Sequence, residues 1–186
     1  MKRIVILASG SGTLAQAIFD AQLDADIVAV ISDQRDAAVL DRAHKARIET
    51  FTIPMLPDRT EWDRELETLI AALKPDLVVS AGFMRILSER ITSKFKIINS
   101  HPALLPLFPG AHAVRDALAA GATETGTTIH WVDAGVDTGK AIAQERVAIF
   151  PGDTEESLHE RIKIVERGLI VATIAELLPT LEKING

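Results

Sequence analysis

The chain has 186 residues, of which 47% are hydrophobic, and this length and composition suit a single globular domain with a buried core. Cysteine is absent, which excludes disulfides, thiolate metal sites and thiol redox sensing. The net charge is −6 and no Lys/Arg run is longer than two, so nucleic-acid binding is not expected. The sequence shows no signal peptide and no span of ~20 apolar residues, which predicts a cytoplasmic protein that does not bind a membrane.

Strands and helices alternate along the first hundred residues. Residues 4–8 form a continuous apolar run, typical of a strand buried on both faces, and apolar residues then recur at helical spacing from Leu14 to Ala21. The same patterns predict further elements, which are strands over 27–31, 50–53, 77–80 and 95–98 and helices over 37–46 and 62–73. This alternation indicates a Rossmann-like, mostly parallel twisted sheet, whose ligands collect beyond the carboxyl ends of the strands.

The pattern changes after residue 100. The stretch HPALLPLFPG, residues 101–110, carries three prolines and one glycine. Two longer strands are then expected over 127–132 and 141–150, and they form an antiparallel C-terminal pair because the loop between them is too short for a crossover helix. Asp153 with Glu156 resembles a capping box, and a long closing helix is expected after it.

The segment GSGTLA, residues 10–15, fits a dinucleotide-binding fingerprint between a strand and a helix. Gly10 and Gly12 permit a tight turn, so that the amides from Ser11 to Thr13 would point at an anion. Asp33, 21 residues past Gly12, favours a dinucleotide, but two fixed glycines are a weak signal and the chain leaves little room for a separate substrate domain. One bound phosphate explains the loop, and a ligand-free turn is the alternative.

The segment INSHPALLP, residues 98–106, carries a stronger signal. In an extended chain Asn99 and His101 project to one side while Ser100 faces away. An amide beside an imidazole can hold a carbonyl oxygen that becomes an oxyanion, and the histidine can also move a proton. The alternative is structural, with Asn99 capping the strand end and His101 hydrogen-bonded in a loop.

Asp137 lies in the glycine-flanked loop VDAGVDTGK. Such a loop can bring a carboxylate to the strand ends, where it would orient the histidine ring, favour its charged form or accept a proton through water. The alternative is an ordinary turn residue.

The remaining histidines give no metal-site spacing, so no metal is predicted. His44 and His159 are expected to be solvated, and His130 alternates along a strand. His112 either lines the cleft or starts a helix, and the sequence leaves both interpretations open.

Five segments, in this order, resemble the phosphoribosylglycinamide formyltransferases, folate-dependent enzymes of purine synthesis. They are SGSGTLAQAI, AGFMRIL, NSHPALLPLFPGAHA, GTTIHWVDAGVDTGKAI and GDTEESLHERI. The resemblance spans essentially the whole chain and implies a formyltransferase fold. It implies transfer of the formyl group of 10-formyltetrahydrofolate to the amino group of glycinamide ribonucleotide on the route to IMP, without a metal. We expect a single domain of residues 1–186, with a phosphate-binding half to about residue 100 and a folate-binding, catalytic half after it.

The resemblance also assigns roles to particular residues of this chain. The catalytic trio falls on Asn99, His101 and Asp137. The residues that bind the substrate phosphate are Ser11, Gly12 and Thr13. The segment that binds folate is Met84, Arg85, Ile86 and Leu87. Glu166 aligns with a carboxylate that contacts the ribonucleotide, whereas Leu14 departs from the family, some of whose members carry Asn there.

Three alternatives stay open at the level of the sequence. A formyltetrahydrofolate hydrolase shares a similar trio but carries an extra N-terminal regulatory domain, whereas this chain begins with the first strand. A formyltransferase acting on methionyl-tRNA or a sugar amine is usually longer. A non-catalytic nucleotide-binding module would use the glycine loop alone. The expected partners are the two small-molecule substrates, and a homodimer is compatible with the sequence.

Overall fold

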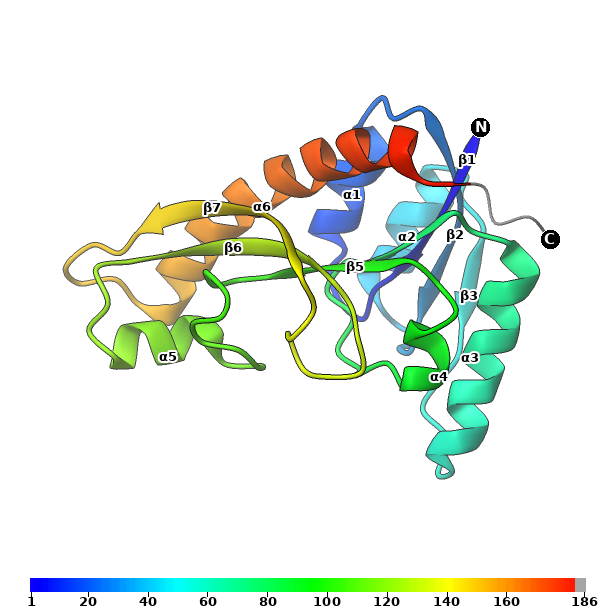
Figure 1. Cartoon of the computed structure of the whole chain (residues 1–186), viewed down its shortest axis with the longest axis horizontal. Helices are drawn as coiled ribbons and strands as arrows, with labels where there is room; N and C mark the ends of the chain where they lie inside the picture. Colours follow the sequence, from blue (N-terminus) through cyan, green and yellow to red (C-terminus); the bar gives the residue numbers. More distant parts are fainter. Residues whose placement is uncertain (183–186) are drawn as a thin grey trace.

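A single mixed sheet of seven strands forms the centre of the computed structural model, which describes residues 1–182 (Figure 1). The strands are β1 (Lys2–Leu7), β2 (Ala25–Ser32), β3 (Thr50–Thr52), β4 (Leu77–Ser80), β5 (Ile97–His101), β6 (Glu124–Trp131) and β7 (Ala141–Ala148). Their order is β3-β2-β1-β4-β5-β6-β7. The first five strands run parallel, β6 pairs antiparallel with β5, and β7 pairs antiparallel with β6. The predicted Rossmann-like sheet with an antiparallel C-terminal pair is therefore confirmed.

Helices cover both faces of this sheet. They are α1 (Thr13–Asp20), α2 (Ala38–Lys45), α3 (Arg59–Leu73), α4 (Glu89–Thr92), α5 (Ala113–Ala119) and α6 (Glu155–Leu177), followed by the 3₁₀ helix η1 (Leu178–Thr180). The helices α1, α2 and α6 share one of the two main hydrophobic cores, and α3 and α4 share the other. The helix α5 packs with β7 and the start of α6 in a third, smaller cluster. Over residues 1–182, no helix is both long enough and apolar enough to cross a membrane.

The two cores divide the residues of β1 between them. Ile4 and Ile6 pack in the core of α1 and α6, whereas Val5 and Leu7 pack in the core of α3, and all four side chains are fully buried. Successive strand residues point to opposite faces, so a strand covered on both faces needs apolar residues at every position. This arrangement explains the continuous apolar run predicted as a strand.

Most predicted strand boundaries differ from the structure by one to three residues, and β5, β6 and β7 show the physical reasons. β5 spans Ile97–His101 instead of residues 95–98, because Phe95 belongs to the turn that follows α4, with its amide bonded to the Ile91 carbonyl. The strand continues to His101 because β6 pairs with it residue for residue, with His130 opposite Asn99. β6 begins at residue 124 instead of 127 and β7 ends at 148 instead of 150, because the two strands pair along that whole length.

The predicted cap of the closing helix is wrong by one residue. Thr154 is the N-cap, its hydroxyl accepts from the Ser157 amide at 3.1 Å, and the Ser157 hydroxyl accepts from the Thr154 amide at 2.9 Å. Asp153, which was expected to be the cap, instead binds Arg161 with both carboxylate oxygens at 2.8 and 2.9 Å. Both oxygens of Asp153 are thus committed to the Arg161 guanidinium, and the neighbouring Thr154 caps the helix.

Candidate active site

A cleft of about 510 Å³ lies beyond the carboxyl ends of β1, β4 and β5. Every residue predicted for the site contributes to its lining, together with residues from the β6–β7 loop and from α6. The predicted residues in the lining are Ser11, Gly12, Thr13, Met84, Arg85, Ile86, Leu87, Asn99, His101, Asp137 and Glu166. The fold thus brings together residues that are up to 155 positions apart, from 11 to 166, at one edge of the sheet.

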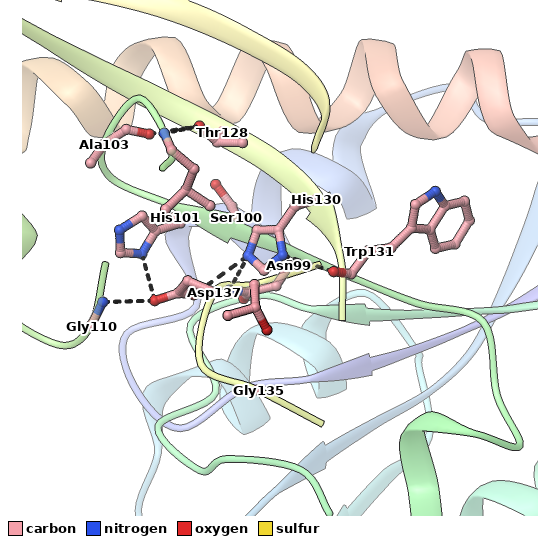
Figure 2. A network of polar contacts seen from close by, with 12 residues as sticks. Asn99, Ser100, His101, Ala103, Gly110, Thr128, His130, Trp131, Gly135 and Asp137 are labelled. Atoms are coloured by element: carbon pink, nitrogen blue, oxygen red, sulfur yellow. Dashed lines mark hydrogen bonds and ion pairs between the residues drawn. The ribbon is translucent and has the colours of Figure 1, made fainter. Parts of the chain in front are cut away.

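His101 is held between two hydrogen-bond acceptors at the end of β5. Its Nδ1 lies 3.3 Å from a carboxylate oxygen of Asp137 (Figure 2), and its Nε2 lies 2.8 Å from the Phe108 carbonyl oxygen. The side chain is almost completely buried. Each ring nitrogen thus has an acceptor within reach, and a ring protonated at both nitrogens would donate to the two acceptors at once.

Asp137 occupies the tip of the loop between β6 and β7 with a left-handed backbone, φ 54°. Its Oδ2 accepts from the Gly110 amide at 2.8 Å and its Oδ1 lies 3.5 Å from His130 Nε2 (Figure 2). Burial opposes ionisation of this carboxyl, but the hydrogen bonds from His130 and Gly110 and the charges of His101 and His130 outweigh it and lower its pKa. Asp137 is therefore a carboxylate facing His101.

His130 is a fourth member of this cluster, which the sequence analysis placed only on a strand. It is buried, and its Nε2 lies 3.3 Å from Asn99 Nδ2 while its Nδ1 lies 2.9 Å from the Trp131 carbonyl oxygen (Figure 2). With Nδ1–H donated to that carbonyl, the neutral ring accepts from the Asn99 amide, whereas the charged ring donates Nε2–H to Asp137. His130 thus links two residues of the predicted trio.

The glycine turn after β1 leads directly into α1. Gly12 is the N-cap of that helix with φ 74°, and no side chain caps the first amides. Arg42 from α2 donates to the Ser11 carbonyl at 2.7 Å, which fixes the turn from outside. The helix dipole and the first amides make this turn suited to an anion.

We expect Gly12→Ala to lower the free energy of unfolding by about 1–3 kcal/mol, because the new Cβ would lie 2.6 Å from Val39 Cβ and the residue would be strained at positive φ. Thermal or denaturant unfolding measures this change. Gly10→Ala is the matched control, since a Cβ there has nothing within 4 Å. Equal stability of the two variants would contradict the close packing of the turn on α2.

Asp33 has a structural role at the end of β2. It is 3% exposed, and its carboxylate accepts from Ser9 Oγ at 2.6 Å, Gln34 Nε2 at 3.0 Å and Arg85 Nε at 2.7 Å. Burial raises its pKa, but these three donors outweigh burial and lower it. Its oxygens are committed to the protein and it does not line the cleft, which removes the feature that favoured a dinucleotide.

The segment from Met84 to Leu87 forms an apolar side of the cleft. Met84 and Ile86 are exposed, whereas Leu87 is buried in the core around α3. Arg85 is anchored by its pair with Asp33, and the Met84 amide donates to Ser9 Oγ at 2.9 Å. The segment therefore offers exposed apolar side chains on an anchored backbone.

Glu166, Lys163 and His159 line the cleft from one side of α6. Burial raises the pKa of Glu166, against smaller opposing effects of Ser100, Lys163, Arg167 and Thr127. His159 was expected to be solvated; it is instead partly buried, and burial followed by the Lys163 charge lowers its pKa. His112 is the N-cap of α5, which settles the two interpretations left open by the sequence.

Over the part of the chain that the structure describes, no group of three or more His, Cys, Asp or Glu side chains is arranged to hold a metal ion. The peptide between Leu105 and Pro106, in the stretch beside the cleft, is cis.

Comparison with known proteins gives one consistent result. The model of the formyl transferase family matches residues 2–174. The chain is 49% identical over 182 residues to the phosphoribosylglycinamide formyltransferase of Mycobacterium tuberculosis, covering 94% of this chain and 84% of the relative. It is 40% identical over 180 residues to that of Escherichia coli, covering 92% and 85%. The crystal structure of glycinamide ribonucleotide transformylase 1 from Symbiobacterium toebii superposes with a TM-score of 0.94 at 39% identity, over 100% of this chain and 92% of that one.

Proposed function

The chain belongs to the formyl transferase family, and from this premise we propose that it transfers a formyl group from 10-formyltetrahydrofolate to the amino group of glycinamide ribonucleotide in purine biosynthesis. It is a formyl-transferring enzyme that uses a folate-derived donor. The observation that carries the proposal is one cleft that joins an anion-binding glycine turn, an apolar segment and a buried His101–Asp137 pair.

Attack of the amine on the formyl carbon places negative charge on the formyl oxygen. We assign the stabilisation of that charge to the Asn99 amide and the His101 imidazolium. Since the Phe108 carbonyl already accepts from Nε2, the Nδ1–H of His101 is the proton that can reach the oxygen, and its 3.3 Å contact with Asp137 is long enough to be shared. Donors aimed at charge that develops only during the reaction lower the barrier without tightening substrate binding.

Asp137 has two roles in this proposal. As a carboxylate it would pair with a protonated His101 ring and hold that ring in place, and through water it accepts the proton that leaves the attacking amine. That proton then passes to the departing folate nitrogen. His130 supports both members of the pair, because it contacts Asn99 and Asp137 from the neighbouring strand.

The two substrates are assigned to opposite ends of the cleft. The amides of Ser11, Gly12 and Thr13 would bind the phosphate of the ribonucleotide, and Glu166 would contact its sugar. The segment Met84, Arg85, Ile86 and Leu87 would bind the folate, whose flat ring suits the apolar side chains there. A cleft of about 510 Å³ is within the usual size for small-molecule sites, and holding both substrates end to end supplies much of the rate.

We further propose that residues 1–186 act as one formyltransferase domain in the cytoplasm. The N-terminal half, to about residue 100, would bind the phosphate and also carry the folate segment, residues 84–87. The C-terminal half would complete the folate site and carry most of the chemistry, with small-molecule substrates as the partners.

Replacing Glu166 with glutamine is expected to raise the Tm of the ligand-free protein near neutral pH and to raise the KM for glycinamide ribonucleotide. A carboxyl with a raised folded-state pKa destabilises the fold once the pH exceeds its unfolded value of about 4.5, because its ionisation in the cleft is unfavourable. The Tm difference from the parent should therefore widen as the pH rises above that value. Glu65→Gln, on the exposed side of α3, is the matched control. A parent more stable than the variant near neutral pH would contradict this assignment.

The acceptor substrate is tested by thermal shift. Glycinamide ribonucleotide is expected to raise the Tm, since a ligand at 100 times its Kd stabilises the native state by about 2.7 kcal/mol. NAD at the same concentration should leave the Tm unchanged, because Asp33 is committed to Arg85. Stabilisation by NAD alone would overturn the proposed acceptor.

A further inference from the structure

The loop between β6 and β7 is closed by hydrogen bonds to one carboxylate oxygen. Asp133 Oδ1 accepts from the Thr138 hydroxyl at 2.6 Å and from the Gly135 amide at 3.0 Å. Asp133, Gly135 and Thr138 are all exposed, and Asp133 and Thr138 lie on opposite sides of the loop. We call these two hydrogen bonds the loop clasp.

The loop is also packed tightly against itself. A Cβ on Gly135 would lie 2.1 Å from Thr138 Oγ1, and one on Gly139 would lie 1.6 Å from the Trp131 carbonyl oxygen. At the base of the loop the Trp131 amide donates to the Lys140 carbonyl at 3.0 Å. The chain thus leaves β6, turns and returns to β7 with little freedom between these contacts.

Asp137 depends on this arrangement because its backbone conformation is unfavourable for a residue with a Cβ. Its φ of 54° lies in the left-handed region, which a non-glycine residue occupies only where the surrounding structure imposes it. Thr138 is the next residue along the chain, so its bond to Asp133 fixes the peptide that follows Asp137. On the other side of the loop, the Gly110 amide holds the Asp137 carboxylate at 2.8 Å.

We propose that Asp133 and Thr138 are positioning residues, which act through the loop clasp to hold the Asp137 carboxylate against His101; this inference rests on the proposed formyl transfer. Neither residue touches the trio through a hydrogen bond found in the structure. Asp133 lines the cleft whereas Thr138 does not, so a substitution at Thr138 separates the effect on the position of Asp137 from an effect on substrate binding. The Thr138 hydroxyl, followed by the Gly135 amide, lowers the pKa of Asp133, so the acceptor of the clasp is an ionised carboxylate at neutral pH.

The clasp is tested first by kinetics. Thr138→Val removes the hydroxyl at nearly constant volume and is expected to lower kcat about 10-fold, since small misplacements of a catalytic group cost up to ~100-fold, while the KM for glycinamide ribonucleotide stays unchanged. Thr138→Ser keeps the hydroxyl and should restore kcat. Thr68→Val is the matched control, because that hydroxyl bonds the Arg64 carbonyl on the distant surface of α3. A Thr138→Val variant with the kcat of the control, or a serine variant as slow as the valine variant, overturns the proposal.

A double-variant cycle locates the effect. If the clasp acts through Asp137, Thr138→Val should lower kcat no further in an Asp137→Asn background, because the group that it positions has lost its charge. If the double variant instead loses kcat by the product of the two single-variant factors, Thr138 acts independently of Asp137 and the proposal is overturned.

Hydrogen exchange gives a readout that does not depend on activity. The Gly110 amide donates to Asp137, so displacement of the carboxylate should speed its exchange in Thr138→Val and leave it slow in Thr138→Ser and Thr68→Val. Unchanged Gly110 exchange in Thr138→Val overturns the clasp. A parent protein that forms no formylated ribonucleotide, but shows this pattern of exchange, would instead overturn the proposed function and leave the positioning role supported.

Discussion

His101→Ala is expected to lower kcat for formyl transfer by about 10²- to 10³-fold, the usual cost of losing one donor to a developing oxyanion. Within the trio, only His101 can be a positively charged donor to the formyl oxygen. Its ring is also held by a second acceptor, the Phe108 carbonyl. The loss should fall on kcat, because the interaction forms only as the charge develops.

The measurement is steady-state kinetics with both substrates varied in turn. His112→Ala is the matched control, since His112 is exposed at the start of α5 and does not line the cleft. The control should keep the parent kcat. A loss below 10-fold in His101→Ala would mean that the ring does not act on the oxygen.

Asp137→Asn should lower kcat by about 10²-fold or more, which is typical for the loss of general acid–base catalysis. The amide cannot accept a proton, and it carries no charge to pair with the His101 ring. The lowered pKa of Asp137 also fixes the direction of the pH dependence: the ionised form persists well into the acidic range, and its contribution to rate and stability is lost only as the pH falls through this lowered folded-state pKa.

The pH dependence of kcat for the parent and for Asp137→Asn tests this assignment. The acidic limb that belongs to Asp137 should be absent from the variant. Asp24→Asn, an exposed aspartate before β2, is the matched control and should keep the parent profile. The same acidic limb in the parent and in Asp137→Asn would assign it to another group.

The parallel part of the fold could be predicted from local pattern alone. The strand of residues 4–8 was recognisable because both of its faces are buried, so its apolar run is uninterrupted. The cap of α6 was misplaced because Asp153, Thr154 and Ser157 are all capable of capping, and Asp153 is instead engaged by Arg161, eight residues further along. That competition is decided by tertiary geometry and not by residue type.

The site was predictable only where its residues are close in sequence or match a motif. Asn99 and His101 share an extended segment, and Asp137 lies between glycines, so each could be proposed from the chain. His130 could not, because its contact with Asn99 arises from the antiparallel pairing of β5 and β6, which a single sequence does not specify. The pairing of Arg85 with Asp33, 52 positions apart, is hidden for the same reason.

The most direct test is the rate of folate deformylation, followed by absorbance, with and without glycinamide ribonucleotide. We expect deformylation to require the ribonucleotide and to yield one formylated ribonucleotide for each folate released. Deformylation at an equal rate without the ribonucleotide would identify a hydrolase, and the absence of deformylation under both conditions would leave the cleft as a phosphate-binding site without this chemistry.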